Sequence, residues 1–227
     1  MKFYVEDFAG AAEFFDGDGF QEWRELESVL EASSVHLQPS DQAGLHRKPI
    51  FDPKATNREL TERAGKLGWR AIPVPEELQM FGKDWDAGKR TTLVEWQFSN
   101  YPFLWNNIIR TQGVYRSHLN LEGMQGVESL LIVTKSGQFP ASNSTLYFEQ
   151  ARSQIKTVMD YLEFTIPIRL IGIALEQNSP QLEAVWNTYA GARYDRVPST
   201  SQKREFDIVW STRKSKYGNP SATFSLK

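Results

Sequence analysis

The sequence contains no cysteine and only three histidines, which narrows the chemistry open to the chain. Without thiols it can form no disulfide, no thiolate zinc site and no thiol nucleophile. His36, His46 and His118 lack the spacing of metal ligands, and we expect each to be a loop or surface residue. The glycines form no GxGxxG fingerprint, P-loop or GxSxG elbow. Dinucleotide binding, P-loop nucleotide binding and serine-hydrolase chemistry therefore have no support.

Long apolar segments are also missing. No window approaches the ~18 consecutive apolar residues of a membrane-spanning helix, and the segment IPIRLIGIAL is short and contains Arg169. The opening residues, MKFYVEDFAG, lack the apolar region of a signal peptide. We therefore expect a soluble, cytoplasmic protein. Its 227 residues are enough for one domain that folds without a metal or a disulfide.

The charges nearly cancel but are unevenly distributed. The formal net charge of −2 argues mildly against a nucleic-acid-binding protein, which often has a basic domain. Residues 1–38 have a balance of −7, whereas residues 193–227 have a balance of +5. The basic tail could form a positive surface for phosphates, and solvated surface charge would fit the same pattern.

The spacing of apolar residues predicts an α/β fold. Residues 33–58 contain three prolines and are expected to be irregular. The predicted helices cover residues 20–32, 57–66, 103–119 and 144–163, and the predicted strands cover residues 91–98, 127–134, 166–175 and 204–210. Because helices alternate with the middle strands, we expect a central mixed β-sheet flanked by helices. We expect a single domain over residues 1–227, in which residues 176–227 form a β- and loop-rich appendage.

The predicted strand TTLVEWQF places two polar residues where a core strand would not need them. With a period of two, Val94 and Trp96 lie on one face, whereas Glu95 and Gln97 lie on the other. Polar side chains add nothing to a core strand. Their presence on one face therefore indicates a second role.

A second acid precedes this strand. Asp86 stands nine residues before Glu95, and the intervening AGKRT has turn character at Gly88. Acids on two strands joined by a turn can converge on one point, and paired carboxylate oxygens suit a hard cation such as Mg²⁺. Such a metal could polarise a phosphoryl oxygen and lower the pKa of bound water. The spacing alone is equally compatible with two surface acids.

Three longer segments resemble a known family. The segments DAGKRTTLVEWQFSNYPFLWNN, FPASNSTLYFEQA and TYAGARYDR are similar to the BglII branch of type II restriction endonucleases, within the PD-(D/E)xK nuclease superfamily. The likeness runs from about residue 20 to residue 196, and the first twenty residues and those after about 198 match poorly. It implies a restriction-endonuclease-like core, and a homodimer that cuts both strands of a palindromic double-stranded DNA site with Mg²⁺, leaving 5′ overhangs.

The resemblance also implies roles for individual residues around the acid pair. Asp86 matches the metal-binding aspartate, and Glu95 matches the acid that, with the metal, orients or activates the attacking water. The backbone carbonyl of Trp96 would be a third metal ligand. Gln97, the third residue expected to be catalytic, occupies the position at which the wider superfamily has a lysine, so a neutral amide would act there beside the metal. The BglII branch shares this departure, so it does not indicate an inactive protein.

The DNA-contacting positions follow from the same resemblance. Residues matching those that read base edges or touch DNA from a C-terminal loop are Ser99, Asn100, Asn143, Ser144, Tyr194 and Arg196. Asn can pair with adenine and Ser with several base edges. The retained FSN and PASNS segments predict AGATCT, or at least a site with a central GATC. Asn143 or Ser144 is also expected to cap the helix at 144–163, where free N–H groups favour a phosphate.

Two other functions are compatible with these residues. A sequence-specific DNA-binding protein could have kept the fold and lost cleavage, although the intact acid pair argues against this. A repair or recombination nuclease on the same core would prefer ends or flaps to a palindrome. The resemblance further leads us to expect a cognate DNA methyltransferase in the same system, without a stable complex between the two proteins.

Overall fold

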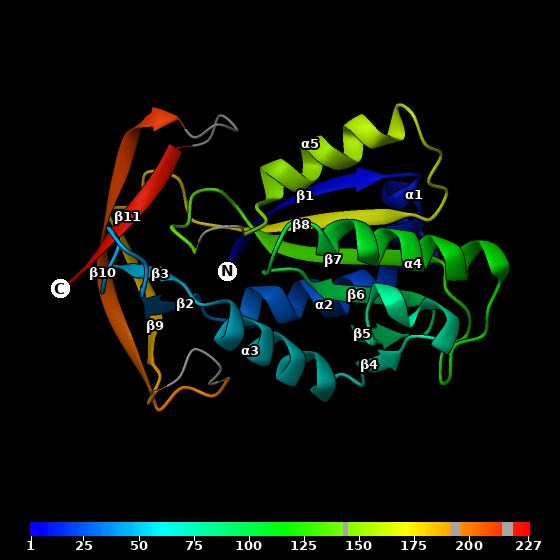
Figure 1. Cartoon of the computed structure of the whole chain (residues 1–227), viewed down its shortest axis with the longest axis horizontal. Coiled ribbons are helices and arrows are strands. Elements are labelled where there is room, and N and C mark those ends of the chain that lie inside the picture. The colour runs from blue at the N-terminus through cyan, green and yellow to red at the C-terminus, as the bar shows by residue number, and fades with distance from the viewer. Residues whose placement is uncertain (143–144, 192–195, 215–219) are drawn as a thin grey trace.

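The computed structural model describes residues 1–142, 145–191, 196–214 and 220–227, with the backbone alone for residues 212–214. These residues form two β-sheets, one of six strands and one of five. Figure 1 shows the six-stranded sheet with its helices on the right and the five-stranded sheet on the left. The molecule is therefore elongated, with the helical layers gathered around one sheet.

The six-stranded sheet mixes parallel and antiparallel pairs. Its strands are β1 (Lys2–Phe8), β4 (Arg70–Pro73), β5 (Asp84–Lys89), β6 (Thr92–Trp96), β7 (Ser129–Lys135) and β8 (Ile168–Ala174). They lie in the order β1-β8-β7-β6-β5-β4, with β6, β7 and β8 parallel and the other pairs antiparallel. Every residue of β6, β7 and β8 is buried, as expected for parallel strands covered on both faces.

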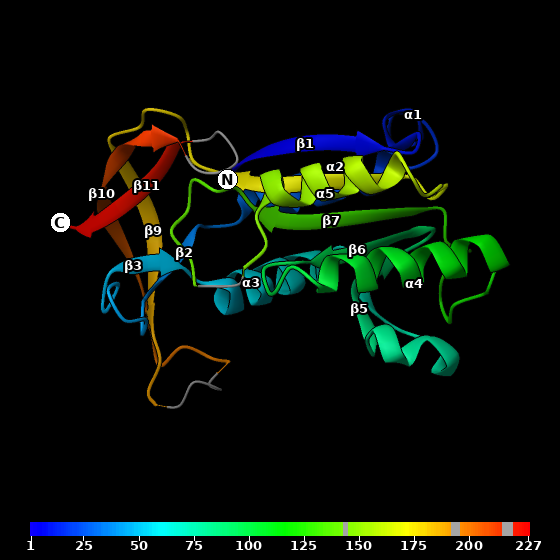
Figure 2. The same cartoon turned by 45° about the horizontal axis from the view of Figure 1, so that its top comes forward.

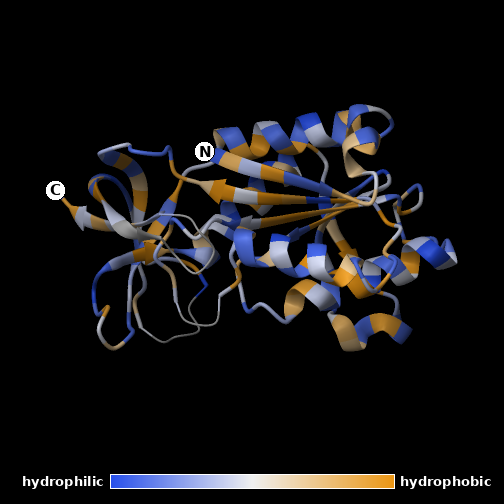
Figure 3. Cartoon of the chain, turned by 90° about the horizontal axis from the view of Figure 1, so that it is seen from above, coloured by the Kyte–Doolittle hydropathy of each residue, from blue (hydrophilic) through white to orange (hydrophobic). Residues whose placement is uncertain are grey.

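Helices cover both faces of this sheet (Figure 2). They are α1 (Ala11–Asp16), α2 (Phe20–Ala32), α3 (Pro53–Lys66), α4 (Phe103–Ser117) and α5 (Phe148–Met159), and the short 3₁₀ helix η1 (Glu76–Phe81) follows β4. Residues of α1, α2 and α3 share one hydrophobic cluster with Val94 and Trp96, whereas residues of α4 and α5 share another with Leu93. Because neighbouring strand residues point to opposite faces, the sheet lies between two helical layers. The apolar strands between more polar helices are visible in Figure 3. The predicted α/β fold with a central mixed sheet is confirmed.

The five-stranded sheet joins two distant parts of the chain. Its strands are β2 (His36–Pro39), β3 (Pro49–Phe51), β9 (Gln181–Thr188), β10 (Thr200–Lys214) and β11 (Pro220–Leu226), in the order β11-β10-β9-β2-β3. The β-rich part therefore includes residues 36–51 as well as C-terminal strands. The prolines suggested that residues 33–58 are irregular, and this prediction is wrong. Strand β2 instead pairs parallel with β9 and antiparallel with β3.

Part of the segment predicted to be irregular belongs to helix α3, which starts earlier than predicted. Helix α3 begins four residues before the predicted start because Asp52 caps it, accepting hydrogen bonds from the backbone N–H groups of Lys54 and Ala55 at 3.1 Å. Pro53 occupies the first helical turn, where its missing N–H costs nothing. Asp52 Oδ2 also accepts hydrogen bonds from Asn187 and Tyr189, at 3.0 and 2.8 Å. The cap thus ties α3 to β9 of the smaller sheet.

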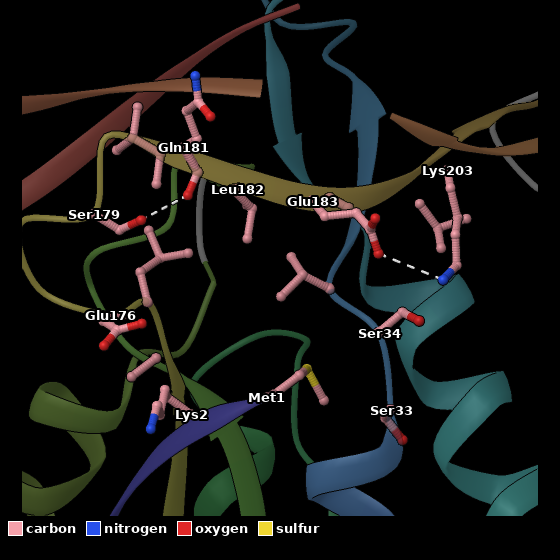
Figure 4. Close-up of a pocket in the computed structure, with 16 residues that line it drawn as sticks. Met1, Lys2, Ser33, Ser34, Glu176, Ser179, Gln181, Leu182, Glu183 and Lys203 are labelled. Atoms are coloured by element: carbon pink, nitrogen blue, oxygen red, sulfur yellow. Dashed lines mark hydrogen bonds and ion pairs between the residues drawn. The ribbon is translucent and has the colours of Figure 1, made fainter. Parts of the chain in front are cut away.

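The two sheets meet at a junction that is apolar in its interior and open at one side. Val35, Leu37 and Phe206 of the β-rich part belong to the same hydrophobic cluster as the strand residues of the larger sheet. Figure 4 shows a cleft of about 330 Å³ at this junction, between the start of the chain and β9. An ion pair of 3.4 Å joins Glu183 to Lys203 at its edge. The two sheets therefore pack against each other through a shared hydrophobic core.

Two local predictions are wrong. Gly88 lies within β5 and the turn falls at Arg90, whose φ is 50°. A Cβ at Gly88 would come within 2.4 Å of Ile72 Cγ1, so this glycine permits close packing. Helix α5 begins at Phe148, with Tyr147 at its N-cap, and not at residue 144. Asn143 and Ser144, the residues expected to cap it, lie outside the described part of the chain.

His36 is also placed differently from expectation. It is a buried residue of β2, not a loop or surface residue, and its Nε2 lies 2.6 Å from Glu59 Oε2 on α3. His36 Nδ1 lies 3.2 Å from Asn187 Nδ2. Its role is therefore to join β2, α3 and β9. Among the described helices, none has both the length and the apolar character needed to cross a bilayer.

Candidate active site

The two acids predicted to converge lie on adjacent strands, Asp86 on β5 and Glu95 on β6. The antiparallel pairing of these strands ends at Ala87 and Val94, the residues next to the two acids. The side chains of Asp86 and Glu95 lie within hydrogen-bonding reach of each other. Asp86 Oδ2 also accepts a hydrogen bond of 2.8 Å from the backbone N–H of Trp96. The predicted convergence of Asp86 with the β6 strand is therefore present.

The environment of the pair disfavours two negative charges. Burial, followed by the neighbouring charge of Asp86, raises the pKa of Glu95 well above its usual range. Burial likewise raises the pKa of Asp86, although the Trp96 N–H opposes this. Two carboxylates at one buried point repel each other in the ionised state. The site therefore favours a bound cation or a shared proton.

Arg110 on α4 supplies one positive charge beside this pair. Its guanidinium forms an ion pair with Glu95, and both side chains are almost fully buried. The same Nη2 donates to the backbone carbonyl of Asp84 at 2.9 Å, and Nη1 donates to that of Phe81 at 3.5 Å. The guanidinium carbon lies 4.8 Å from the Trp85 ring centroid. These contacts hold Arg110 between η1, β5 and β6.

Gln97, at the superfamily's lysine position, is buried and fully hydrogen-bonded. Its Oε1 accepts from Asn107 Nδ2 at 2.8 Å. Its Nε2 donates to Ser99 Oγ and to the backbone carbonyl of Asn100, each at 3.2 Å. Gln97 therefore links the end of β6 both to α4 and to the following segment. Contact between its amide and a phosphate would require one of these bonds to be exchanged.

An open groove of about 940 Å³ brings the acid pair together with most of the other predicted residues. Its lining includes Asp86, Glu95, Trp96, Gln97, Ser99, Asn100 and Arg196. Ser99, Asn100 and Arg196 are exposed. The groove is also lined by Lys54, Arg58 and Arg110, so it has cationic groups suited to a polyanion. Asn143, Ser144 and Tyr194 lie outside the described residues, so their predicted contacts with DNA stay predictions.

Sequence analysis missed two polar residues of this site, Asn107 and Arg110. Both lie on the buried face of α4, one helical turn apart. Sequence analysis followed the apolar residues of this helix. The available signal was two polar side chains at helical spacing next to the apolar residues Leu104, Ile108 and Val114. Such a pair has to be matched by polar partners, here Gln97 and Glu95.

Sheet, acid pair and cationic groove together define the class of protein. The strand arrangement matches that of a crystal structure of restriction endonuclease BglII complexed with a DNA 16-mer, with a TM-score of 0.89, 34% identity and full coverage of both chains. A crystal structure of free BglII matches with a TM-score of 0.70 and 30% identity, over 98% of this chain and 100% of that one. The chain thus has the fold of a restriction endonuclease, and its described conformation is closer to the DNA complex.

The particular family follows from the sequence comparisons. A family model described as restriction endonuclease BglII/BglIII matches residues 3–173. The type II restriction enzyme BglII of Bacillus subtilis is 40% identical over 198 residues, which cover 87% of this chain and 86% of that protein. The chain therefore belongs to the BglII/BglIII family of restriction endonucleases. The family match begins at residue 3, so the limit of about residue 20 expected from the quoted segments was too narrow.

Proposed function

We propose that this chain is a type II restriction endonuclease that hydrolyses both strands of a palindromic DNA site with Mg²⁺. The observation that supports this most directly is the buried Asp86–Glu95 pair beside an open, cation-lined groove, in a member of this family. The proposed site is AGATCT or another GATC-centred sequence, cut to leave 5′ overhangs. Retention of the FSN and PASNS segments supports this choice of site.

The acid pair fits a divalent cation, which type II restriction endonucleases generally use. One guanidinium faces two buried carboxylates, so a further positive charge would relieve their repulsion. Carboxylate and carbonyl oxygens are the ligands Mg²⁺ prefers, and Asp86, Glu95 and the Trp96 carbonyl would supply them. When bound, Mg²⁺ would polarise the scissile phosphate, lower the pKa of a bound water and stabilise the leaving oxyanion.

The protein side chains then have distinct tasks. Asp86 would hold the cation, and Glu95 would orient the attacking water and accept its proton. Arg110 restrains the Glu95 carboxylate and adds a fixed positive charge beside it. Gln97 lacks that charge, and its three hydrogen bonds make it a support for the segment that follows β6.

DNA recognition is assigned to the groove beyond the acid pair. Ser99 and Asn100 lie three and four residues after the end of β6 and are exposed, so their side chains can reach base edges. Arg196 lines the same groove from the segment after β9 and can contact a phosphate or a base. Asn143, Ser144 and Tyr194 are assigned to DNA contact on the family resemblance. The residues from 176 onward then form the DNA-contacting appendage, with β2 and β3 as its support.

A palindromic site calls for two copies of the chain. In a two-fold symmetric homodimer each subunit reads one half-site and cuts one strand. A DNA methyltransferase of the same specificity would protect the host DNA from such an enzyme, as a separate protein acting in the same system.

The decisive experiment is a digest of a plasmid library with Mg²⁺, followed by sequencing of every new end. We expect ends clustered at one GATC-centred palindrome with a 5′ overhang. The Glu95→Ala variant should produce none of these ends and still bind the site in Ca²⁺. Uncut DNA that wild-type protein binds specifically in Ca²⁺ would instead identify a DNA-binding protein without cleavage.

A further inference from the structure

Lys135, the last residue of β7, is a buried lysine that the proposed chemistry does not use. Its side chain is 1% exposed. The ammonium lies 5.4 Å from the Phe51 ring centroid and 5.2 Å from the Tyr147 ring centroid. Among the described residues no carboxylate forms an ion pair with it. Burial of an ammonium without a counter-ion is costly, so the folded chain must gain something from its hydrogen bonds.

Those hydrogen bonds reach two separate segments. Nζ donates to the backbone carbonyl of Phe98 at 3.4 Å, to that of Leu146 at 3.2 Å, and to Thr145 Oγ1. An ammonium has three donors, which matches these three acceptors. Thr145 Oγ1 in turn donates to the Phe98 carbonyl at 3.2 Å. Lys135 is therefore the common partner of the chain around residue 98 and the chain around residue 145.

Each of these segments adjoins residues assigned to base reading. Phe98 directly precedes Ser99 and Asn100, and Thr145 directly follows the 143–144 pair. The segments also bond to each other, because the Leu146 N–H donates to the Ser99 carbonyl at 3.0 Å and Asn100 forms an antiparallel bridge with Thr145. They extend from neighbouring ends of the parallel strands β6 and β7. A shift in one segment would therefore move the other.

We infer that Lys135 is a positioning residue for DNA specificity, whose ammonium fixes the spacing between the Phe98–Asn100 segment and the Thr145–Leu146 segment. This inference rests on the proposed function, because it assigns base reading to both segments. Base-edge hydrogen bonds depend on placement within a few tenths of an ångström. Loss of the Lys135 hydrogen bonds would therefore weaken discrimination between DNA sequences more than it weakens hydrolysis at the acid pair.

The protonation state of Lys135 offers a way to test this role. Burial lowers the pKa of Lys135 to about 7. Above that pH the neutral amine has two donors for three acceptors. The titratable groups on the adjoining α5 segment are Glu149 and Tyr147, and burial raises the pKa of Tyr147, which therefore stays neutral. Phe51 and Phe98, on the other sides, carry no charge. Discrimination between the specific DNA site and sites that differ by one base pair should therefore fall as the pH rises through about 7.

The first test compares cleavage of AGATCT with cleavage of sites that differ by one base pair. In Lys135→Met we expect the ratio of kcat/KM values between these sites to fall at least about 10-fold, the scale of one lost base contact. Lys156→Met, on the exposed face of α5, is the matched control and should keep the wild-type ratio. The wild-type ratio should decline between pH 6 and pH 8.5, and the Lys135→Met ratio should not. A variant with lowered thermal stability but unchanged ratio and pH profile would overturn the inference.

A second test does not depend on cleavage. Amide hydrogen exchange of Leu146, whose N–H bonds to the Ser99 carbonyl, reports the contact between the two segments. In Lys135→Met this amide should exchange at least about 10-fold faster, while the Ile132 amide within β7 keeps its protection. Should that variant fail to fold, Thr145→Val removes one of the three acceptors and should act in the same direction. Unchanged exchange of the Leu146 amide in Lys135→Met would refute the positioning role of Lys135, even if the wild-type protein cuts DNA. If the wild-type protein cuts no DNA, the proposed function is refuted, and the exchange of this amide still tests whether Lys135 holds the two segments together.

Discussion

Asn107 Nδ2 donates a hydrogen bond of 2.8 Å to Gln97 Oε1, which ties the end of the catalytic strand β6 to helix α4. Both side chains are buried, at 5% and 3% exposure. The other end of the Gln97 amide holds Ser99 and Asn100. One pair of amides therefore connects the helix that bears Arg110 with the segment assigned to base reading.

Asn107→Ala should destabilise the protein and lower its activity. The variant leaves the buried Gln97 oxygen without a donor, which costs about 1–3 kcal/mol in the free energy of unfolding. Urea unfolding with a structure-sensitive probe would measure this loss. Asn106→Ala, at the neighbouring half-buried position, is the matched control and should cost less. Equal stability of the two variants would show that the Asn107–Gln97 bond contributes little.

The acid pair should make stability fall with rising pH when no divalent cation is present. The folded-state pKa values of Asp86 and Glu95 are raised above their unfolded values. The folded protein therefore holds protons that the unfolded chain has released, and stability is lost as the pH rises from the unfolded pKa values through the folded ones. Unfolding by urea in EDTA, at intervals from pH 4 to pH 8, would measure the slope. The Asp86→Asn/Glu95→Gln double variant should show a shallower slope.

Divalent cations should reverse this effect. A cation that binds only the folded state raises the midpoint of thermal unfolding, so Ca²⁺ or Mg²⁺ should stabilise the wild-type protein at pH 8. The double variant should gain little from either ion. A similar gain in both proteins would place the bound cation away from the acid pair.

Arg196→Ala should weaken DNA binding with a characteristic salt dependence. If the Arg196 guanidinium contacts one phosphate, its loss reduces the slope of log K against log salt by roughly one. Binding in Ca²⁺ at several KCl concentrations would measure the slope for specific and unrelated duplexes. Arg24→Ala, on α2 far along the sequence from the groove-lining residues, should leave the slope unchanged. A slope unchanged in Arg196→Ala, with lost preference for the specific site, would indicate a base contact.

Glu59 should support the fold at neutral pH and stop doing so in acid. Burial alone would raise its pKa, but hydrogen bonds from His36, Arg63 and the Ser34 backbone lower the pKa to about 2. A pKa below the unfolded value stabilises the folded state above the unfolded pKa, and this contribution is lost as the pH falls from about 4.5 towards 2. Acid unfolding of wild type and Glu59→Gln should therefore differ at pH 6 and converge near pH 2. A difference that persists at pH 2 would contradict the assignment.

The buried middle of the larger sheet could be predicted from sequence, whereas its edges could not. Strands β6, β7 and β8 are rich in β-branched and apolar residues, and each lies within two or three residues of its predicted range. Strand β1, with the sequence KFYVEDF, has one fully buried residue and mixes polar with apolar side chains. Strands β2 and β3 are only four and three residues long and contain prolines. Their pairing with β9 and with each other depends on tertiary contacts that local propensity does not encode.

The acid pair was predictable because Asp86 and Glu95 flank a short strand–turn–strand unit, which fixes their relative position locally. Arg110 comes from a helix fifteen residues further along, and its approach to Glu95 depends on how α4 packs against the sheet. Phe103 and Ile109, whose apolar side chains support the prediction of α4, are exposed. The buried face of that helix is instead partly polar, because it covers the polar side of β6. An apolar stripe is therefore a poor guide to helix orientation beside an active site.

Each sheet is completed by strands from opposite ends of the chain, which bears on when the protein becomes active. Lys2 of β1 pairs with Ala174 of β8, and His36 of β2 pairs with Val185 of β9. Contacts between residues so far apart in sequence form slowly, because a long loop has to close first. A chain emerging from the ribosome can form the β5–β6 hairpin with its two acids early, but it cannot complete the six-stranded sheet until β8 has been synthesised, or the five-stranded sheet until β11 has been synthesised. We therefore expect the DNA-cutting form to appear only after β11 has been synthesised.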